Sequence, residues 1–468
     1  MQPPDDPTAG ARDRGSGDAA AESEGEQRAA ERLAAEDMAR QAKANLKSLV
    51  SDDSSSLPSL GAIADDIRLQ LADSGEVAIL YVRLKRYGRL ERIFGWQIVA
   101  DILAAIARNL SEMVGGTLRA LDVLADFTLS DNAFVVVLSP PRSGQPISPE
   151  DLLMVRRRVY ERLQGTLLND LAPGVYDRVH PFVGAAVIYE DDALTFEQNL
   201  QKGVALAMQA AERDAKGYDA ELETTLAEVL AGDDLEALFQ PIVDVRRKGV
   251  VGYHAAARGP FYSPLRLPDV LADVARRSPL LGTFGVAARQ AAVARANGLM
   301  PEELLFVNCV ANELPNAAIV ALSEFYSLNT TLVPQHVVFD LAAADLTANA
   351  ASTLRVLGNV REMGFQLCIA DLGAEFTVLD LIGRAQPEFL SIDPLLVAGS
   401  AGDPTMIDSV QFLLRFSARI GAQLIATEVS DEEQFEALRG VGVELFRGEL
   451  VARPDTRLPK VSFAKLGL

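Results

Sequence analysis

The sequence is poor in the residue types that build several common kinds of site. Its 468 residues include two cysteines, three histidines and one tryptophan. Three scattered histidines are too few for a histidine-based metal centre. Both cysteines, Cys309 and Cys368, lie in apolar segments with a strand-like pattern, so we expect buried free thiols in a reducing cytoplasm.

The sequence also lacks long apolar segments and an excess of positive charge. No run of about 20 apolar residues occurs, so we expect no membrane-spanning helix. The N-terminus lacks a basic start followed by an apolar core, and we therefore expect no signal peptide and a cytoplasmic protein. The formal net charge of −21 argues against general affinity for the backbone of DNA or RNA. A small basic pocket for a phosphate ligand is still compatible with that charge.

The length and the changes in composition predict three parts. Residues 1–60 are rich in Ala, Glu, Asp, Ser and Gly with almost no aromatic residues, which predicts disorder, with a possible helix at 25–49. Residues 61–220 carry strand-like runs at 77–84, 134–138 and 181–189, which alternate with helical patterns and predict a smaller α/β domain. Residues 221–468 form the third part. Helical patterns predict helices at 200–214 in the second part and at 221–230 and 316–325 in the third.

The third part opens with two apolar runs joined by a short basic turn. Residues 238–245 and 250–257 flank Arg246, Arg247, Lys248 and Gly249, which predicts a β-hairpin. Strand-like runs then alternate with helical ones up to residue 446, and Asp431 is placed to cap a helix at 431–439. This repetition predicts an α/β fold of the (β/α) barrel type, in which chemistry occurs at the carboxyl ends of the strands.

The hairpin resembles the signature strand pair of the EAL domain family of bacterial cyclic-di-GMP phosphodiesterases. The Glu-Ala-Leu that names the family is His254-Ala255-Ala256 here, whereas the matching residues are Gln240, Pro241, Ile242, Gly252, Tyr253, Arg258 and Gly259. The resemblance extends over about residues 226–454 and implies a TIM-like barrel. In the family, two divalent cations held by carboxylates and an Asn activate the water that attacks the phosphodiester.

Only part of that metal site is kept. The resemblance places Asn308, Asp340 and Asp371 at positions of oxygen ligands. Other metal and catalytic positions of the family hold different residues, namely His254, Ala370, Ser391, Thr427, Ser430 and Arg447. The resemblance therefore implies a degenerate site, no enzyme activity and no cofactor. The favoured interpretation of the three kept residues is that they hold strand ends and cap helices.

Residues 61–220 resemble the GGDEF domain, the diguanylate cyclase fold that often precedes EAL. Arg83 and Lys85 stand where the family has metal-binding acidic residues, and residues 128–134 contain no Gly-Gly, so cyclase activity is not expected. Arg119 and Asp122 match the R-x-x-D pattern of the family's inhibitory nucleotide site. A structural ion pair is the favoured interpretation of these two residues, with ligand binding as the alternative.

These observations lead to one expected function and one alternative. We expect a catalytically inactive GGDEF–EAL signalling protein that acts as a regulatory scaffold through contacts with protein partners, with homodimer formation by analogy. It is also a possible cyclic-di-GMP receptor, with Gln240 and Arg258 contacting the ligand. The alternative is a residual phosphodiesterase that uses Mg²⁺ or Mn²⁺ at Asn308, Asp340 and Asp371, with His254 as a further ligand.

Overall fold

The computed structural model describes residues 57–84, 87–127, 133–140, 146–191, 193–310, 332–347, 350–373 and 378–468. Of the disorder predicted for residues 1–60, the part up to residue 56 lies outside these residues, as do the helix predicted within 25–49 and the helix predicted at 316–325. The prediction is wrong at its end, because Leu60 is 1% exposed and its N–H donates to the Asp126 carbonyl at 3.1 Å. The chain forms two compact units. One holds Met1–Tyr87 and Ala100–Ala215, and the other holds Gly88–Val99 and Lys216–Leu468.

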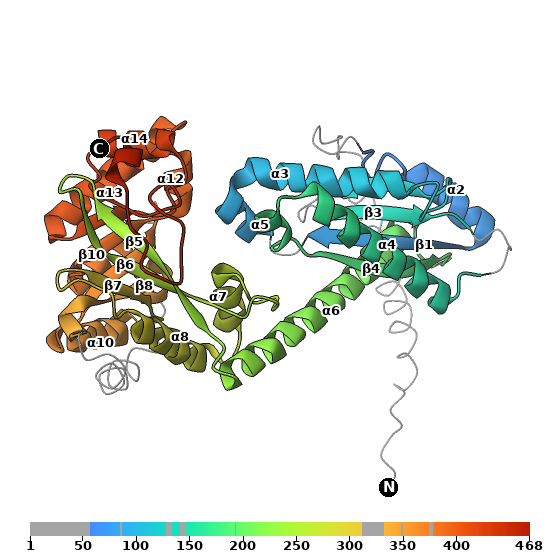
Figure 1. The fold of residues 1–468 in the computed structure, drawn as a ribbon. Coiled ribbons are helices and arrows are strands. Elements are labelled where there is room, and N and C mark those ends of the chain that lie inside the picture. Colours follow the sequence, from blue (N-terminus) through green and yellow to red (C-terminus); the bar gives the residue numbers. More distant parts are fainter. Residues whose placement is uncertain are drawn as a thin grey trace, which may run out of the picture. The chain divides into compact units, whose positions relative to one another are not determined.

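The first unit is built on an antiparallel sheet whose strand order is β2-β3-β1-β4 (Figure 1). Its strands are β1 (Glu76–Leu84), β2 (Val123–Phe127), β3 (Ala133–Leu138) and β4 (Pro181–Tyr189). The strands predicted at 77–84, 134–138 and 181–189 are confirmed. Strand β2 was not predicted, because Asp126 interrupts its short apolar run. Central strand β1 is buried along almost its whole length, so the sheet forms the core of this unit.

Five helices are described in or adjoining the first unit. They are α2 (Ala64–Ser74), α3 (Tyr87–Met113), α4 (Pro149–Asp170), α5 (Pro173–Tyr176) and α6 (Phe196–Ala231). Helix α4 starts at Ser148, whose hydroxyl accepts a hydrogen bond from the Asp151 N–H. The sequence predicted separate helices at 200–214 and 221–230, but α6 is continuous through Gly217, since a lone glycine costs a helix only about 1 kcal/mol. The predicted domain boundary at residues 220 and 221 therefore lies inside a helix.

The second unit contains a closed barrel whose strand order is β10-β11-β12-β5-β6-β7-β8-β9. Strand β5 pairs antiparallel with both of its neighbours, and the remaining pairs are parallel. The predicted hairpin and the predicted barrel are thus confirmed. The strands are β5 (Glu236–Asp244), β6 (Gly249–Arg258), β7 (Leu304–Asn308), β8 (Val337–Ala342), β9 (Gln366–Leu372), β10 (Phe389–Ile392), β11 (Gln423–Ala426) and β12 (Leu445–Phe446).

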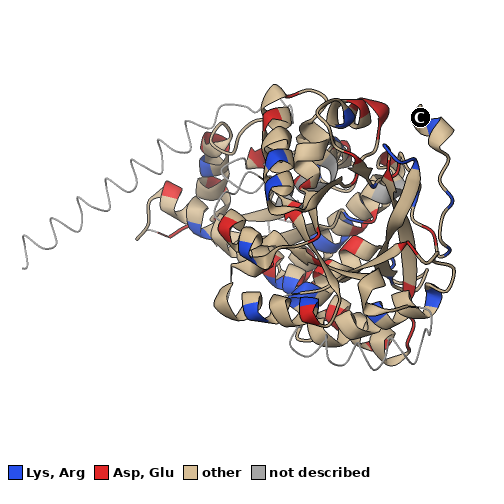
Figure 2. Cartoon of the chain, turned by 90° about the vertical axis from the view of Figure 1, so that its left-hand side faces the viewer, with Lys and Arg blue, Asp and Glu red and all other residues tan. Residues whose placement is uncertain are grey.

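Helices follow most strands of the barrel (Figure 1). They are α7 (Pro268–Arg277), α8 (Leu281–Arg295), α10 (Ala350–Glu362), α11 (Leu379–Ala385), α12 (Pro394–Gly399), α13 (Pro404–Ile420) and α14 (Glu432–Gly440), with short 3-10 turns at Pro334–His336, Ala343–Leu346 and Phe463–Leu466. The predicted cap is confirmed, because the Asp431 carboxylate accepts from the Gln434 N–H. Among the described residues, none of the helices combines the length and apolar character needed to cross a bilayer. Figure 2 shows basic and acidic residues interspersed over these helices.

The inside of the barrel is filled with apolar side chains. Phe306 and Phe389 meet edge to face with ring centroids 5.1 Å apart. The same buried cluster includes Ile242, Val338, Cys368, Phe389, Ile425 and Leu445. Such a packed interior leaves no channel through the barrel, so a ligand must be bound at an end of the strands.

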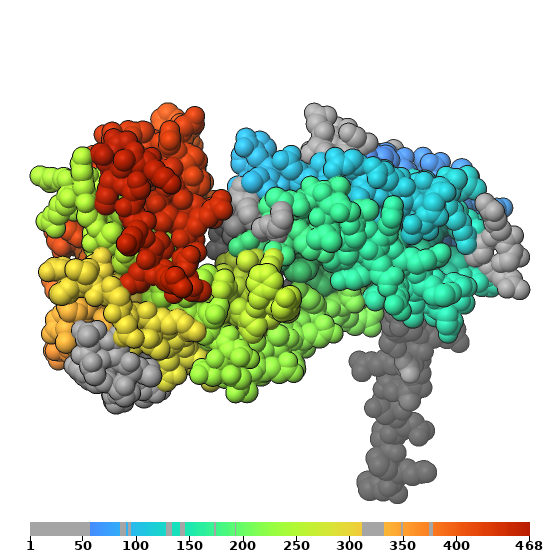
Figure 3. Space-filling model, in the orientation of Figure 1, coloured from blue at the N-terminus to red at the C-terminus, as the bar shows by residue number. Residues whose placement is uncertain are grey.

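The C-terminal segment pairs with strand β5 through an antiparallel bridge between Phe239 and Asp455. The Phe239 N–H donates to the Asp455 carbonyl at 2.7 Å, and the Asp455 N–H donates back to Phe239 at 3.1 Å. Figure 3 shows this segment, in red, lying against the β5–β6 hairpin. Gln240 stands opposite His254 in the register of the hairpin.

Gly252 lies where strands β6 and β7 are closely packed. A Cβ at this position of β6 would lie 2.2 Å from the Leu304 carbonyl oxygen of β7. We expect Gly252→Ala to lower the free energy of unfolding by about 2–3 kcal/mol, because the backbone of β7 cannot move away without breaking the barrel. Urea unfolding followed by circular dichroism measures the change.

Gly249 provides the matched control in the same strand. A Cβ at Gly249 has no neighbour within 4 Å, so Gly249→Ala should leave the urea midpoint nearly unchanged. Equal effects of the two substitutions would show that the close contact between β6 and β7 does not limit stability.

Candidate ligand-binding site at the carboxyl end of the barrel

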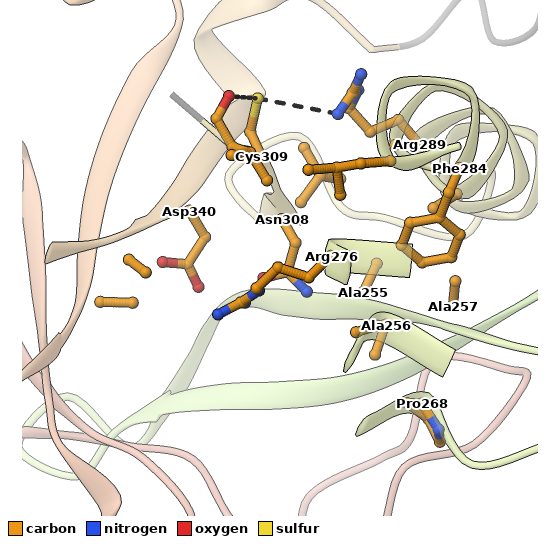
Figure 4. Close-up of a pocket in the computed structure, with 18 of the residues that line it drawn as sticks. Ala255, Ala256, Ala257, Pro268, Arg276, Phe284, Arg289, Asn308, Cys309 and Asp340 are labelled. Atoms are coloured by element: carbon orange, nitrogen blue, oxygen red, sulfur yellow. Dashed lines mark hydrogen bonds between the residues drawn. The ribbon is translucent and has the colours of Figure 1, made fainter. Parts of the chain in front are cut away.

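A pocket opens at the carboxyl ends of strands β6 to β9 (Figure 4). The strands contribute Ala255 to Ala257, Asn308, Asp340, Ala370 and Asp371 to its lining. Helices α7 and α8 form the opposite wall with Arg276, Phe284 and Arg289, among others. The pocket thus lies where the barrel fold predicts chemistry to occur.

The helical wall of the pocket is both apolar and cationic. Arg289 is only 5% exposed, and its Nη1 lies 3.9 Å from the Cys309 Sγ, the contact drawn in Figure 4. Arg276 lies in the last turn of helix α7 and lines the same wall. Burial raises the pKa of Asp345, and the Arg276 guanidinium offsets part of that rise. Two guanidinium groups beside an apolar ring suit an anionic ligand that also carries aromatic bases.

A compact polar cluster lies on the strand side of the pocket. His254 Nε2 is 3.2 Å from Asn308 Oδ1 and 3.6 Å from Asp340 Oδ2. The side chains of His254 and Asp340 are 13% and 10% exposed. Asp340 Oδ1 is buried and has no hydrogen-bond partner among the described residues. An unsatisfied buried carboxylate oxygen is costly, which is typical of a site that receives a ligand or proton.

Burial changes the charge of this cluster. Burial raises the pKa of Asp340 to about 6, while the Arg447 guanidinium acts in the opposite direction. Burial and the same guanidinium lower the pKa of His254 well below its usual value, so the imidazole is neutral at pH 7. Partial desolvation and the neighbouring Asp393 raise the pKa of Asp371. The cluster therefore holds a neutral imidazole and two carboxylates that ionise less readily than usual.

Arg447 supplies the positive charge that opposes most strongly the raised pKa of these carboxylates. Its backbone is fixed after strand β12, since its N–H donates to the Ala426 carbonyl at 2.8 Å and its carbonyl accepts from the Val429 N–H at 3.1 Å. Its side chain is 12% exposed and lies 3.5 Å from the Glu428 carboxylate. Arg447 Nε is buried without a hydrogen-bond partner among the described residues. Next to it, Gly448 allows the chain to approach Val429 so closely that a Cβ would lie 2.1 Å from the Val429 carbonyl oxygen.

The residues present do not fit the pair of divalent cations that the resemblance implies. Within the described ranges, no group of three His, Cys, Asp or Glu residues is arranged to hold a metal ion. Of the three kept oxygen ligands, Asn308 has its Oδ1 next to His254 instead. The Arg447 guanidinium is close enough to act on the pKa of both Asp340 and Asp371, and it would repel a divalent cation placed there.

Three of the predicted site residues line the pocket, and the others do not. Asn308, Asp340 and Asp371 all line the pocket. Gln240 instead donates from Nε2 to the Ala452 carbonyl at 3.1 Å, and Arg258 is paired with Glu236. Their predicted role in ligand binding stays a prediction.

Arg119 and Asp122 lie in the first unit and fix a turn. Asp122 accepts hydrogen bonds from the Arg119 N–H and from the N–H and hydroxyl of Ser139, each at 2.7 Å. The Arg119 guanidinium donates to the carbonyls of Ser139 and Pro140 at 2.9 and 2.8 Å. Arg119 and Asp122 therefore stabilise the local structure as expected. They do so through hydrogen bonds to neighbouring groups and not through an ion pair between their side chains.

The pocket residues that were not predicted from the sequence include Arg276, Phe284 and Arg289. All three lie on helices α7 and α8, where the helical period alone does not show which side chains turn towards the strands. The basic pair Arg276 and Arg277 at the end of the helix was the available signal.

The raised pKa of Asp340 predicts a pH-dependent effect of its removal. The folded protein holds this proton more tightly than the unfolded chain, whose pKa is near 3.8. The ionised carboxylate therefore lowers stability increasingly as pH rises from about 4 to 6, and fully above that range. We expect Asp340→Asn to stabilise the protein by on the order of 2 kcal/mol at pH 8 and by much less at pH 4.

Thermal unfolding at the two pH values measures this difference. Asp408→Asn is the control, because Asp408 is exposed on helix α13. An Asp340→Asn shift in Tm that is the same at pH 4 and pH 8 would contradict the prediction.

A model of the EAL domain family matches residues 223–454, which include every strand of the barrel. Among similar proteins is the blue light- and temperature-regulated antirepressor BluF of Escherichia coli, which is 22% identical over 51% of this chain and 58% of its own length. The cyclic di-GMP phosphodiesterase NbdA of Pseudomonas aeruginosa is 23% identical over 81% of this chain and 48% of its own length. The chain thus spans about half the length of these curated relatives.

A solved structure is similar as well. A standalone EAL protein from Vibrio cholerae O395, in a c-di-GMP-bound form, is 25% identical over 50% of this chain and 97% of that chain, with a TM-score of 0.44.

The comparisons correct the expectation that the chain is not an enzyme. Relatives that are 20% to 23% identical to it are named cyclic di-GMP phosphodiesterases. The replacements at His254, Ala370 and Ser391 alter the site without showing that its chemistry is lost, and the three kept oxygen ligands do meet in one pocket. Residues 223–454 of this chain are therefore an EAL domain, related to cyclic-di-GMP phosphodiesterases.

Proposed function

We propose that the EAL domain binds cyclic-di-GMP at the carboxyl end of the barrel and that binding regulates contacts with a protein partner. The observation that supports this most directly is the pocket that combines Arg276 and Arg289 with Asn308 and the Phe284 ring. Cyclic-di-GMP carries two phosphodiester charges and two flat guanine bases. Arginines can form paired hydrogen bonds with its phosphates, and an apolar wall suits its bases.

The regulatory part of the proposal is supported by the relatives. BluF, an antirepressor by name, is similar to half of this chain, and its name describes a regulator. A ligand-controlled surface is the simplest way for a barrel to regulate a partner, because the ligand stabilises whichever conformation binds it better. A homodimer is proposed by analogy alone, and light scattering of the purified chain tests it.

Gln240 and Arg258 remain proposed ligand contacts. Both are engaged within the protein, so the ligand would have to compete with existing bonds. Arg258 would exchange Glu236 for a phosphate, and a side chain of Arg258 that is 34% exposed can make that exchange.

The first unit is proposed to be a degenerate GGDEF-like domain. Its support is that the similarity to MucR of Pseudomonas aeruginosa, named a bifunctional diguanylate cyclase/cyclic di-GMP phosphodiesterase, covers 83% of the chain, well beyond the EAL domain. Arg83, at the position of a metal-binding Asp in that family, lies near Glu212 Oε1 at 3.6 Å. The proposal assigns this unit a structural role, with ligand binding at Arg119 and Asp122 as the alternative.

A second candidate function is hydrolysis of cyclic-di-GMP at the same site. It is supported by the relatives named phosphodiesterases and by the meeting of Asn308, Asp340 and Asp371 at one pocket. Incubation of the full chain with cyclic-di-GMP and Mn²⁺, followed by chromatography of the linear product, tests it. Product formation that is lost in Asp371→Asn and kept in Asp408→Asn would establish this function.

Titration calorimetry of the full chain with cyclic-di-GMP tests the binding proposal. We expect saturable binding, and we expect Arg276→Ala to weaken it by roughly tenfold or more, since a hydrogen bond to a charged group is lost. No measurable heat at high ligand concentration would overturn the proposal.

Arg277→Ala is the matched control for that experiment. Arg277 is adjacent in helix α7, but its guanidinium pairs with Asp219 at 3.3 Å and Asp273 at 2.8 Å, away from the pocket lining. Its removal should leave the affinity unchanged. Equal weakening by both variants would indicate an effect on helix α7 and not on a ligand contact.

A further inference from the structure

Arg447 stands among acidic groups where the resemblance implies divalent cations. Its backbone lies beside the carboxyl end of strand β11, and its guanidinium acts on the ionisation of Asp340, Asp371 and His254. A metal ion is often the largest charge in such a site and determines how its neighbours ionise. Here a side chain of the protein provides that charge permanently, because a guanidinium does not lose its proton.

The backbone of Arg447 is fixed, whereas its guanidinium is incompletely hydrogen-bonded. Backbone hydrogen bonds to Ala426 and from Val429 fix Arg447 on both sides of its peptide. Nε is buried and has no hydrogen-bond partner in the part of the chain that the structure describes. A buried charge needs hydrogen-bond partners, so the unsatisfied Nε–H favours a further anionic partner for this guanidinium.

The anion that now pairs with Arg447 is weakly held. Glu428 reaches Arg447 Nη2 at 3.5 Å, which is long for a charged hydrogen bond, and its side chain is 57% exposed. Its backbone has φ of 59°, a left-handed conformation that is unfavourable for a residue other than glycine. An ion pair at this distance, with one partner more than half exposed, contributes little, so a phosphate can displace the carboxylate at small cost.

We propose that the Arg447 guanidinium provides the permanent positive charge at the carboxyl end of the barrel. In the free protein it pairs with the Glu428 carboxylate, and a phosphodiester of the ligand displaces that carboxylate. This inference rests on the proposed binding of cyclic-di-GMP. It deepens that proposal by naming the group that receives the phosphate and the internal group that competes with it. Binding then needs no divalent cation.

Calorimetry of the full chain with cyclic-di-GMP, in EDTA and in Mg²⁺, tests this proposal. We expect the same affinity in both buffers. We expect Arg447→Gln to weaken binding in EDTA by roughly tenfold or more. Glu428→Gln should tighten binding by roughly two- to fivefold, the range that an exposed ion pair supports.

Glu449→Gln is the control for charge alone. Glu449 is also exposed and carries the same charge two residues from Arg447, but its carboxylate faces Arg453 at 3.8 Å. It should leave the affinity unchanged. Because Glu428 is a surface residue, its variant keeps the test valid even where Arg447→Gln unfolds the barrel.

The outcomes separate this inference from the function on which it rests. Binding that requires Mg²⁺, or binding that Glu428→Gln leaves unchanged or weakens, would overturn the role of Arg447 and Glu428 while leaving cyclic-di-GMP as the ligand. Absence of binding in both buffers for the unmodified chain would overturn the proposed function, and the inference with it.

Discussion

The antiparallel pairing of strand β5 with both of its neighbours is the constraint on which the barrel depends. It reverses one strand in a set that is otherwise parallel, so the amino end of β5 lies beside the carboxyl ends of the other strands. Glu236 therefore stands next to Arg258, and Gln240 stands opposite His254. The same strand accepts the C-terminal segment through Phe239 and Asp455. Closure, the hairpin and the attachment of the chain end all follow from this single reversal.

The ionisable side chains buried at the mouth of the barrel are only weakly paired with one another. Asp340, with a pKa of about 6, is easily neutralised, and His254 is neutral, so Arg447 has fewer opposing charges than the number of acidic residues suggests. Two residues at strand ends, Asp371 and Glu428, adopt left-handed backbone conformations with φ of 58° and 59°. Such strain outside glycine is typical of positions where a particular side chain is required. The mouth is thus less stable than the packed interior beneath it.

Much of the fold could be predicted from the sequence, and the site only in part. Apolar runs of strand length located most barrel strands, because each is buried on two sides and reads as continuous apolar sequence. The short strand β2 was not predicted, because Asp126 interrupts its apolar pattern. Helix α6 was predicted as two helices, because separate helical patterns lie on either side of Gly217. At the site, kept oxygen ligands predicted the pocket position. The contributions of Arg276 and Arg289 depend on how helices α7 and α8 turn towards the strands, which spacing does not specify.

The position of Cys368 has a consequence for how barrel opening can be observed. This residue is 1% exposed inside the barrel, and burial together with the adjacent Asp340 carboxylate raises the pKa of its thiol well above the usual value. A thiol-reactive reagent needs both access and the thiolate, and the closed barrel withholds both. The rate at which Cys368 is alkylated therefore reports the frequency with which strands β8 and β9 separate. Alkylation of Cys368 can therefore measure local unfolding of the barrel without an added probe.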